Sequence, residues 1–187
     1  NATPDSFSDG GRFVRDDRAG GSGRLDLGGA LAAAKELEEG GADVLDVGGE
    51  STRPGAEPVP LEVELARTLP VIEALSEATA LPLSIDTRKA RVADAALAAG
   101  ACVVNDVSGL RDDPAIADVA AAHGAWLVIG HMRGTPATMQ RSPHFDDVLG
   151  EVARELAESI ERAARAGVAA DRIVADAGIG FGKRLED

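Results

Sequence analysis

Short apolar runs alternate with amphipathic stretches along this chain, and five of the runs end in polar side chains. The runs end at Asp46, Asp86, Asn105 with Asp106, His131 and Asp176. Short Val, Ile and Leu runs separated by helical stretches are typical of buried parallel strands. A polar group at a strand end is costly to bury without a partner, and the carboxyl ends of strands form the active-site face of (β/α) barrels. One such residue could equally cap a helix, but five together favour a binding site.

Hydrophobic periodicity predicts helices between these strands. We expect helices at about 26–39, 61–75, 89–99, 114–123 and 145–166, and strands that end near Val47, Asp86, Asn105, Gly130 and Asp176. Pro70 interrupts the second apolar stripe, so that helix should kink or restart there. Segments 1–24, 48–60 and 131–145 lack periodicity and are predicted to be loops.

The repeating helix–turn–strand unit predicts a parallel sheet with right-handed crossovers. The fold class is therefore α/β, a (β/α)8 TIM barrel, which usually needs about 250 residues. Only five strands are visible in 187 residues, so we expect an incomplete barrel whose first strand precedes Asn1 and whose last two units follow Asp187. Residues 1–187 show no domain boundary and are interpreted as a single barrel domain. On their own we expect them to be inactive.

Composition limits the classes of partner. A net charge of −13 argues against nucleic acid, and any anionic ligand must be held by local cations. No apolar stretch is long enough to span a membrane. The single cysteine, Cys102, starts an apolar strand and is expected to be a buried thiol, and Trp126 is expected in the core. Without a disulfide framework, the cytoplasm is the expected location.

Three strand-end residues, Asp86, Asn105 and Asp176, should face one mouth of the barrel. No Cys/His set accompanies them, which argues against zinc. Two carboxylates and an amide suit a neutral heterocycle with a donor–acceptor–donor edge. Acid/base hydrolysis by two carboxylates, as in glycosidases, is the alternative and requires one raised carboxyl pKa.

Anionic groups on a ligand need donors in the loops. Arg53 lies in a Gly- and hydroxyl-rich loop and suits bidentate contact with phosphate; the alternative is a surface ion pair with Glu50. Asn1, Asp5 and Asp9 offer oxygen ligands that suit Mg²⁺ bound together with a substrate diphosphate, although this stretch could equally be an ordinary solvated loop.

The Gly-rich stretch at 178–183 resembles a phosphate cradle but departs from the P-loop pattern at Ala177 and Arg184. The alternative is a turn that lets Phe181 pack over the barrel mouth. His131 is interpreted as structural rather than catalytic.

These loops together resemble dihydropteroate synthase, the pterin-binding enzyme family of the folate pathway. The matching segments occur in family order: NATPDSFSDGG (1–11), GGESTRPGA (48–56), SIDTR (84–88), NDVSG (105–109), HMRG (131–134) and Asp176 with GFGK (180–183). Pterin-binding methyltransferase domains share the barrel but not both of the first two loops.

The resemblance implies a transferase that condenses 6-hydroxymethyl-7,8-dihydropterin diphosphate with p-aminobenzoate, giving 7,8-dihydropteroate and diphosphate, with Mg²⁺ as cofactor. It implies small-molecule substrates and a homodimer of the full-length protein. Position by position, it implies that the pterin is bound by Asp86, Asn105, Asp176 and Met132, and that the diphosphate is contacted by Thr52 and Arg53. It implies a pocket for aminobenzoate, where sulfonamides compete, that is shaped by Phe7, Thr52, Pro54 and Phe181. It also implies a metal ligand at Asn1, and catalytic roles for Asp9 and Arg53 in organising the metal and the diphosphate.

The chain departs from the family pattern at several positions. Ala2, Gly130, Ala177 and Arg184 replace the usual Val, Met, Pro and Thr. The family's later pterin-ring Lys and its Arg-x-His anion site have no counterpart in these 187 residues. Two alternatives therefore stay open: a pterin-binding methyl-transfer domain with a corrinoid partner, and a non-catalytic paralogue that binds pterin only.

Overall fold

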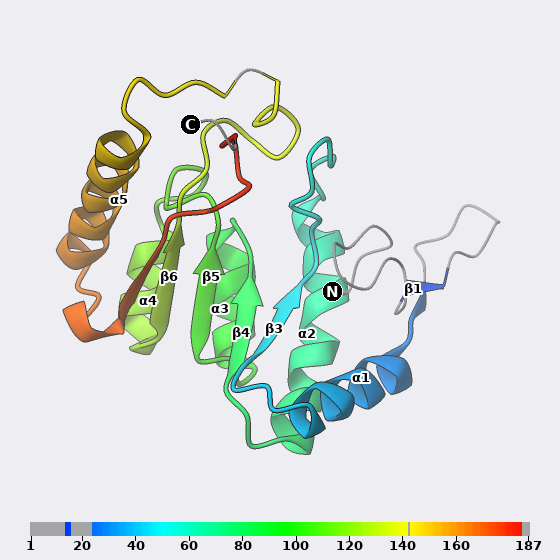
Figure 1. Cartoon of the computed structure of the whole chain (residues 1–187). Helices are drawn as coiled ribbons and strands as arrows, with labels where there is room; N and C mark the ends of the chain where they lie inside the picture. The colour runs from blue at the N-terminus through cyan, green and yellow to red at the C-terminus, as the bar shows by residue number, and fades with distance from the viewer. Residues whose placement is uncertain (1–13, 16–23, 142, 185–187) are drawn as a thin grey trace.

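Five parallel strands form the main sheet of the computed structural model, which describes residues 14–15, 24–141 and 143–184 (Figure 1). The strands are β3 (Leu45–Gly48), β4 (Leu83–Asp86), β5 (Val103–Asp106), β6 (Trp126–Gly130) and β7 (Ile173–Asp176), and they lie in sequence order. Each strand pairs in parallel with the next one along the chain. The predicted parallel α/β sheet is therefore confirmed.

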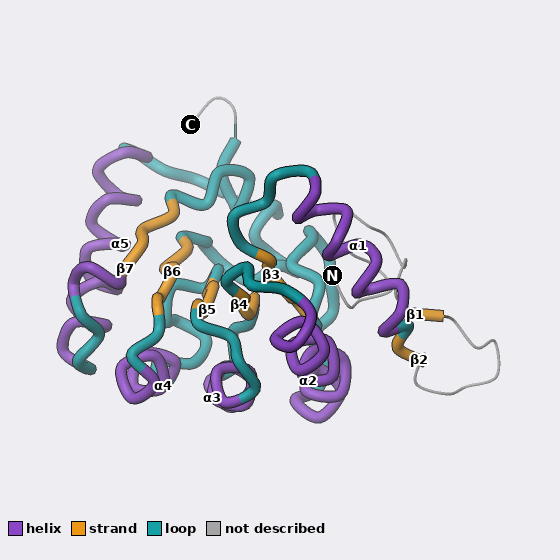
Figure 2. Tube along the Cα trace, turned by 90° about the horizontal axis from the view of Figure 1, so that it is seen from below, coloured by secondary structure: helices purple, strands orange, loops and turns teal. Residues whose placement is uncertain are grey.

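The helices are α1 (Leu27–Glu39), α2 (Leu61–Ala78), α3 (Ala90–Ala98), α4 (Ile116–His123) and α5 (Val148–Arg165), with a short 3₁₀ turn at Ala170–Arg172 before β7. Helices α2 to α5 connect successive strands of the sheet and pack against it or against one another, whereas α1 precedes β3 and packs on α2. Figure 2 shows the strands as an arc with α2, α3 and α4 on its convex side. No helix in the described ranges has both the length and the apolar character needed to cross a bilayer.

The second helix runs through Pro70 without a break, so of the two predicted outcomes the restart is wrong, while the kink stays a prediction. A proline removes only one intrahelical hydrogen bond. Thr68 before it and Val71, Ile72 and Leu75 after it are buried, and this packing stabilises the helix on both sides of the proline.

Strand pleating sorts the side chains into two sets. Leu45, Ile85, Val104 and Leu127 face the helices and are buried, because successive residues of a strand point to opposite faces. Trp126 precedes Leu127, so it points to the concave face, where it is 43% exposed.

Cys102, just before β5, is also exposed and lines that concave face. The predictions of a core tryptophan and a buried thiol are both wrong in this structure. The physical reason is that no second layer packs on the concave side among the described residues.

A small antiparallel ribbon lies where only a loop was predicted. β1 (Val14–Arg15) pairs with β2 (Arg24–Leu25). Two-residue strands are too short to produce a recognisable alternation in the sequence. The predicted site residues Asn1, Phe7 and Asp9 lie outside the described residues.

Candidate active site

The carboxyl ends of the five strands lie at one edge of the sheet, and the loops 49–60, 131–141 with 143–147, and 177–184 lie at that edge (Figure 1). Strand register then places the predicted polar residues. Asp86 is the direct neighbour of Asn105 across β4 and β5. Asp176 is paired with Gly130. On the concave face, Asp176 therefore lies one row of side chains further toward the carboxyl ends of the strands than Asn105. The structure therefore brings these three residues to the same end of the same face, as predicted.

A cavity of about 620 Å³ lies on this concave face. Its walls include Asn105 and Asp176 together with Asp46. Asn105 Nδ2 donates a hydrogen bond to Asp46 Oδ2 at 3.2 Å, which orients the amide. Asp86 does not form part of this wall, although it is adjacent to Asn105 in the sheet. Asp46 was predicted to be a strand-end residue, but no motif around it pointed to a role in binding.

The Asp86 carboxyl has a strongly raised pKa. Burial raises the pKa of this carboxyl well above its ordinary value, and the neighbouring carboxylates of Asp46, Glu64 and Asp106 raise it further, while Arg88 opposes them. Its side chain forms no hydrogen bond with any residue in the described ranges. Asp86 is thus a carboxyl group whose ionised form would be stabilised by N–H donors of a ligand.

Asp106 follows Asn105 and points to the opposite face of the sheet, where it stabilises the next turn. Its carboxylate accepts hydrogen bonds from Ser108 N (2.8 Å), Ser108 Oγ (2.7 Å) and Leu110 N (2.7 Å). These bonds hold a turn in which Leu110 has φ 63°, in the left-handed region. The NDVSG segment therefore combines one residue that faces the cavity with one that fixes the following turn.

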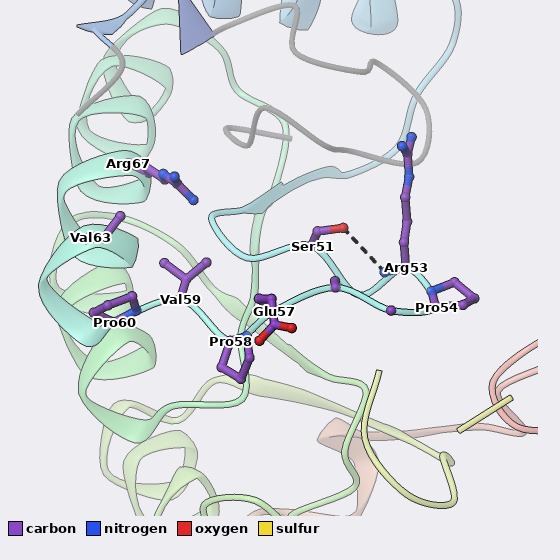
Figure 3. A pocket seen from close by; sticks show the side chains of 11 residues that line it. Ser51, Arg53, Pro54, Glu57, Pro58, Val59, Pro60, Val63 and Arg67 are labelled. Atoms are coloured by element: carbon purple, nitrogen blue, oxygen red, sulfur yellow. Dashed lines mark hydrogen bonds between the residues drawn. The ribbon is translucent and has the colours of Figure 1, made fainter. Parts of the chain in front are cut away.

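The loop after β3 forms a second pocket of about 590 Å³ (Figure 3). Arg53 and Pro54 line one part of it and Arg67 of α2 lines another, whereas Thr52 is not among its lining residues. Arg67 Nη1 donates to Gly49 O at 3.0 Å, and Gly55 N donates to Pro136 O at 3.0 Å. The loop that carries Arg53 is thus attached to both α2 and the 131–147 loop.

Glu50, suggested above as an alternative partner of Arg53, instead forms ion pairs with Arg88 and Lys89. Glu64, on α2, pairs with Lys89 and is completely buried. The sequence interpretation missed this cluster. A signal was present, since Glu64 and Thr68 fall on the apolar face of the predicted helix, where a carboxylate requires a partner.

The loop after β7 is a turn held by one lysine. Lys183 Nζ donates to the carbonyls of His131 (3.0 Å), Gly178 (2.9 Å) and Phe181 (3.2 Å). Burial lowers the pKa of Lys183 to about 8, despite the opposing effect of Asp176. Because the amine binds backbone carbonyls, this stretch functions as the predicted glycine-rich turn, with Phe181 half-buried in it.

His131 and Met132 are both buried beside this turn. His131 Nε2 lies 3.0 Å from Glu155 Oε2, and burial lowers the pKa of the imidazole. This agrees with a structural role. Met132, predicted to contact pterin, does not line the concave cavity; its carbonyl accepts a hydrogen bond from Arg111 at 2.5 Å.

The described residues contain no group of three or more His, Cys, Asp or Glu side chains arranged to hold a metal ion. A Mg²⁺ ion bound mainly by a diphosphate and one or two protein oxygens requires no such group.

Comparison with known proteins finds one enzyme family that matches along the whole chain. The model of the family described as pterin binding enzyme matches residues 1–187. The dihydropteroate synthase of Synechocystis is 45% identical over 186 residues, covering 100% of this chain and 61% of the relative. That of Bacillus subtilis is 42% identical, covering 100% of this chain and 59% of the relative. This chain thus spans about three fifths of the length of these curated relatives.

Solved structures of dihydropteroate synthases are also similar to this chain. The Yersinia pestis dihydropteroate synthase in a sulfonamide drug complex has a TM-score of 0.89 and 41% identity, covering 100% of this chain and 63% of that chain. The Xanthomonas albilineans dihydropteroate synthase in complex with 7,8-dihydropteroate has a TM-score of 0.76 and 43% identity, covering 98% of this chain and 60% of that chain.

Proposed function

Because the chain belongs to the pterin binding enzyme family, we propose that the full-length protein is a dihydropteroate synthase. It would condense 6-hydroxymethyl-7,8-dihydropterin diphosphate with p-aminobenzoate and release diphosphate. The observation that carries the proposal is the adjacency of Asp86 and Asn105 on one inward-facing row, with Asp176 one row beyond and the Arg53 loop at the same end of the sheet. The dihydropteroate synthases that this chain matches along its length support it.

In this mechanism the strand-end residues bind the heterocycle. Asp86 and Asp176 accept hydrogen bonds from ring and amino N–H groups, and Asn105 can donate to one ring atom and accept from another. Ligand N–H groups favour the ionised form of Asp86 and so oppose the burial that raises its pKa. Pterin binding and ionisation of Asp86 are therefore coupled.

The loop residues act on the leaving group. Thr52 and Arg53 would contact the diphosphate, while Pro54, Phe181 and Phe7 would shape the site for p-aminobenzoate. The amine nitrogen of p-aminobenzoate forms a bond to the pterin methylene carbon as the bond from that carbon to the diphosphate oxygen breaks, and the amine loses a proton. Negative charge moves onto the diphosphate, so Arg53 stabilises the transition state more than the ground state.

We propose that Asn1 and the substrate diphosphate would hold Mg²⁺, and that Asp9 would help to organise the ion and the diphosphate. When bound, the ion would neutralise charge on the departing diphosphate. The homodimer of the full-length protein also remains a prediction, which light scattering after size-exclusion chromatography would test.

Assay of the full-length protein tests the proposed function directly. We expect 7,8-dihydropteroate to form only when both substrates and Mg²⁺ are present, with one diphosphate released per product. Pterin binding without product would favour a non-catalytic paralogue. Methyl transfer to or from a corrinoid protein would favour the methyl-transfer alternative. Glycoside hydrolysis, which would also use a carboxyl of raised pKa, would overturn the assignment of Asp86 as a pterin ligand.

Arg53→Ala should reduce use of the diphosphate substrate far more than binding of a pterin without diphosphate. A hydrogen bond to a charged group contributes about 1.5–3 kcal/mol, so we expect a loss of kcat/KM on the order of tenfold to a hundredfold. Arg91→Ala is the matched control, because Arg91 is exposed on α3. Equal losses for substrate and bare pterin would show that Arg53 only supports the fold.

A further inference from the structure

A buried ion-pair cluster lies beneath the loop that carries Thr52 and Arg53. Glu50 starts this cluster: it is only 6% exposed, and its Oε2 accepts a hydrogen bond from Val59 N at 2.9 Å. Glu50 and Val59 are nine positions apart, one on each limb of the loop. The Glu50 carboxylate therefore ties the two limbs together at their base.

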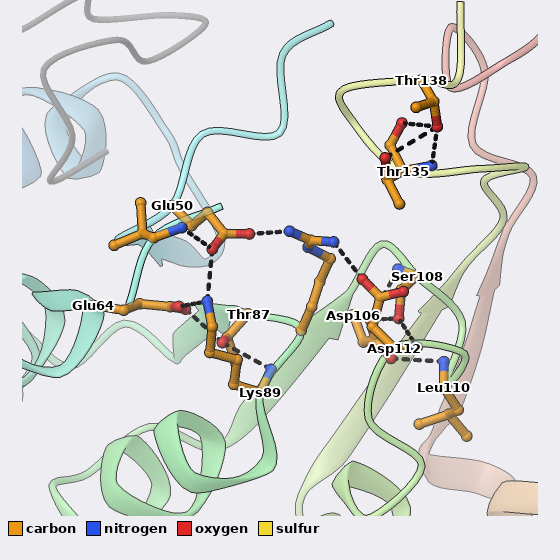
Figure 4. Close-up of polar contacts among 12 residues, drawn as sticks. Glu50, Glu64, Thr87, Lys89, Asp106, Ser108, Leu110, Asp112, Thr135 and Thr138 are labelled. Atoms are coloured by element: carbon orange, nitrogen blue, oxygen red, sulfur yellow. Dashed lines mark hydrogen bonds and ion pairs between the residues drawn. The ribbon is translucent and has the colours of Figure 1, made fainter. Parts of the chain in front are cut away.

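Lys89 connects this base to the second helix. Its Nζ lies 2.6 Å from Glu50 Oε2 and is also ion-paired with Glu64, which is 0% exposed (Figure 4). Thr87 Oγ1 donates to the other oxygen of Glu64 at 2.6 Å. One ammonium group thus bridges two buried carboxylates, Glu50 of the loop and Glu64 of α2, and without it Glu64 would have no cationic partner among the described residues.

Arg88 extends the cluster to the other side by pairing with both Glu50 and Asp112. Burial alone would raise the pKa of Glu50, but Lys89, the Val59 amide and Arg88 outweigh it, so the pKa of Glu50 is lowered and the group is ionised at neutral pH. The contacts of Glu50 with Lys89 and Arg88 are therefore ion pairs.

Thr87, Arg88 and Lys89 follow directly after Asp86, the last residue of β4. The segment that ends in a proposed pterin ligand thus continues into the anchors of the proposed diphosphate loop. Glu50, which pairs with both Arg88 and Lys89, joins the base of the loop to this segment.

We propose that Lys89 is a positioning residue, which by bridging Glu50 and Glu64 fixes the 50–59 loop so that Thr52 and Arg53 meet the diphosphate of a pterin held at Asp86. This inference rests on the proposed function. Lys89 touches no substrate in this arrangement; it sets the distance between two parts of the site.

Lys89→Met in the full-length protein tests the inference, because Met keeps most of the side-chain length and removes the charge. We expect kcat/KM for the pterin diphosphate to fall on the order of tenfold to a hundredfold, as for small misplacements of catalytic groups. The Kd of a pterin without diphosphate should change less than about twofold, well below one hydrogen bond. Lys89→Arg should recover part of the loss, since guanidinium also bridges two carboxylates.

Lys35→Met is the matched control, because Lys35 forms an exposed ion pair with Glu39 on α1, and it should leave all these values unchanged. If Lys89→Met does not fold, Glu64→Gln is tested in its place, because this substitution removes one charge of the bridge and keeps the side-chain shape. Glu64→Gln should likewise lower kcat/KM for the pterin diphosphate while leaving the Kd of the bare pterin nearly unchanged. Unchanged kcat/KM, or an equal loss for bare pterin, would overturn the inference. A wild-type protein that forms no dihydropteroate would instead overturn the proposed function, so the two failures are distinguishable.

Discussion

Asp86→Asn should weaken pterin binding by on the order of 2–5 kcal/mol, the usual cost of removing one partner of a buried charged pair, and should at the same time make the unliganded protein more stable. The amide has nearly the same shape but cannot accept N–H bonds with both of its polar atoms. It also carries no charge, so it avoids the burial and the carboxylate repulsion that raise the pKa of Asp86.

The sign of the pH effect follows from that raised pKa. The folded state holds the Asp86 proton more tightly than the unfolded chain, so the free energy of unfolding falls as pH rises from the unfolded pKa to the folded one. Above the folded pKa this decrease in the free energy of unfolding is complete. Asp86→Asn should abolish this pH dependence. Pterin binding has the opposite trend in the wild type: affinity falls as pH drops below the raised pKa, because the ligand prefers the ionised form.

Calorimetry with a pterin analogue and urea unfolding between pH 5 and 8 (roughly the range in which most proteins are maximally stable) would measure both effects. Asp43→Asn is the matched control, since Asp43 is exposed between α1 and β3. Unchanged pterin affinity would remove Asp86 from the site, and lower stability of Asp86→Asn at neutral pH would contradict the electrostatic argument.

Gly178→Ala should disrupt the turn after β7 and, with it, the position of Asp176. A Cβ at Gly178 would overlap the His131 carbonyl, lying 2.9 Å from its carbon, and φ is +63°. Gly178 N also donates to Asp176 Oδ1 at 2.9 Å. Left-handed backbone costs an alanine about 1–2 kcal/mol, and overpacking against a rigid backbone adds roughly 1–3 kcal/mol.

Gly180→Ala separates these two costs. Gly180 has φ +90° but nothing within 4 Å of an added Cβ, so this variant carries only the backbone term. Thermal unfolding and pterin affinity of both variants in the full-length protein are the measurements. We expect Gly178→Ala to be the less stable of the two and to bind pterin more weakly; equal behaviour would mean that the turn moves away from His131 without cost.

The strands and the residues at their ends were predictable because both depend on local pattern. A Val, Ile or Leu run shows a buried strand wherever it occurs, and the residue that follows it lies at the carboxyl edge. Asn105 and Asp176 were located this way. The burial of Cys102 and Trp126 was predicted wrongly because an apolar run does not show which face of each strand is covered.

The ion-pair cluster was not predictable from local pattern. Glu50 and Lys89 are 39 positions apart, and Lys89 and Glu64 are 25 positions apart, so their contact depends on how β3, α2 and β4 pack. The same holds for Lys183 and His131, 52 positions apart. The sequence shows that a buried Glu64 needs a partner, but only the packed sheet shows which one it has.

The distribution of acidic groups in the site has a consequence for how a ligand arrives. Asp46, Asp86 and Asp176 lie on the strands, whereas Arg53 lies in the loop above them. A molecule with a neutral ring at one end and phosphates at the other would therefore be aligned by the electric field before any contact forms, because the reverse orientation would bring its phosphates close to the carboxylates. This alignment should weaken as salt shortens the Debye length, about 8 Å at physiological ionic strength. Productive encounters should become rarer at high salt even where the affinity of the neutral ring alone is unchanged.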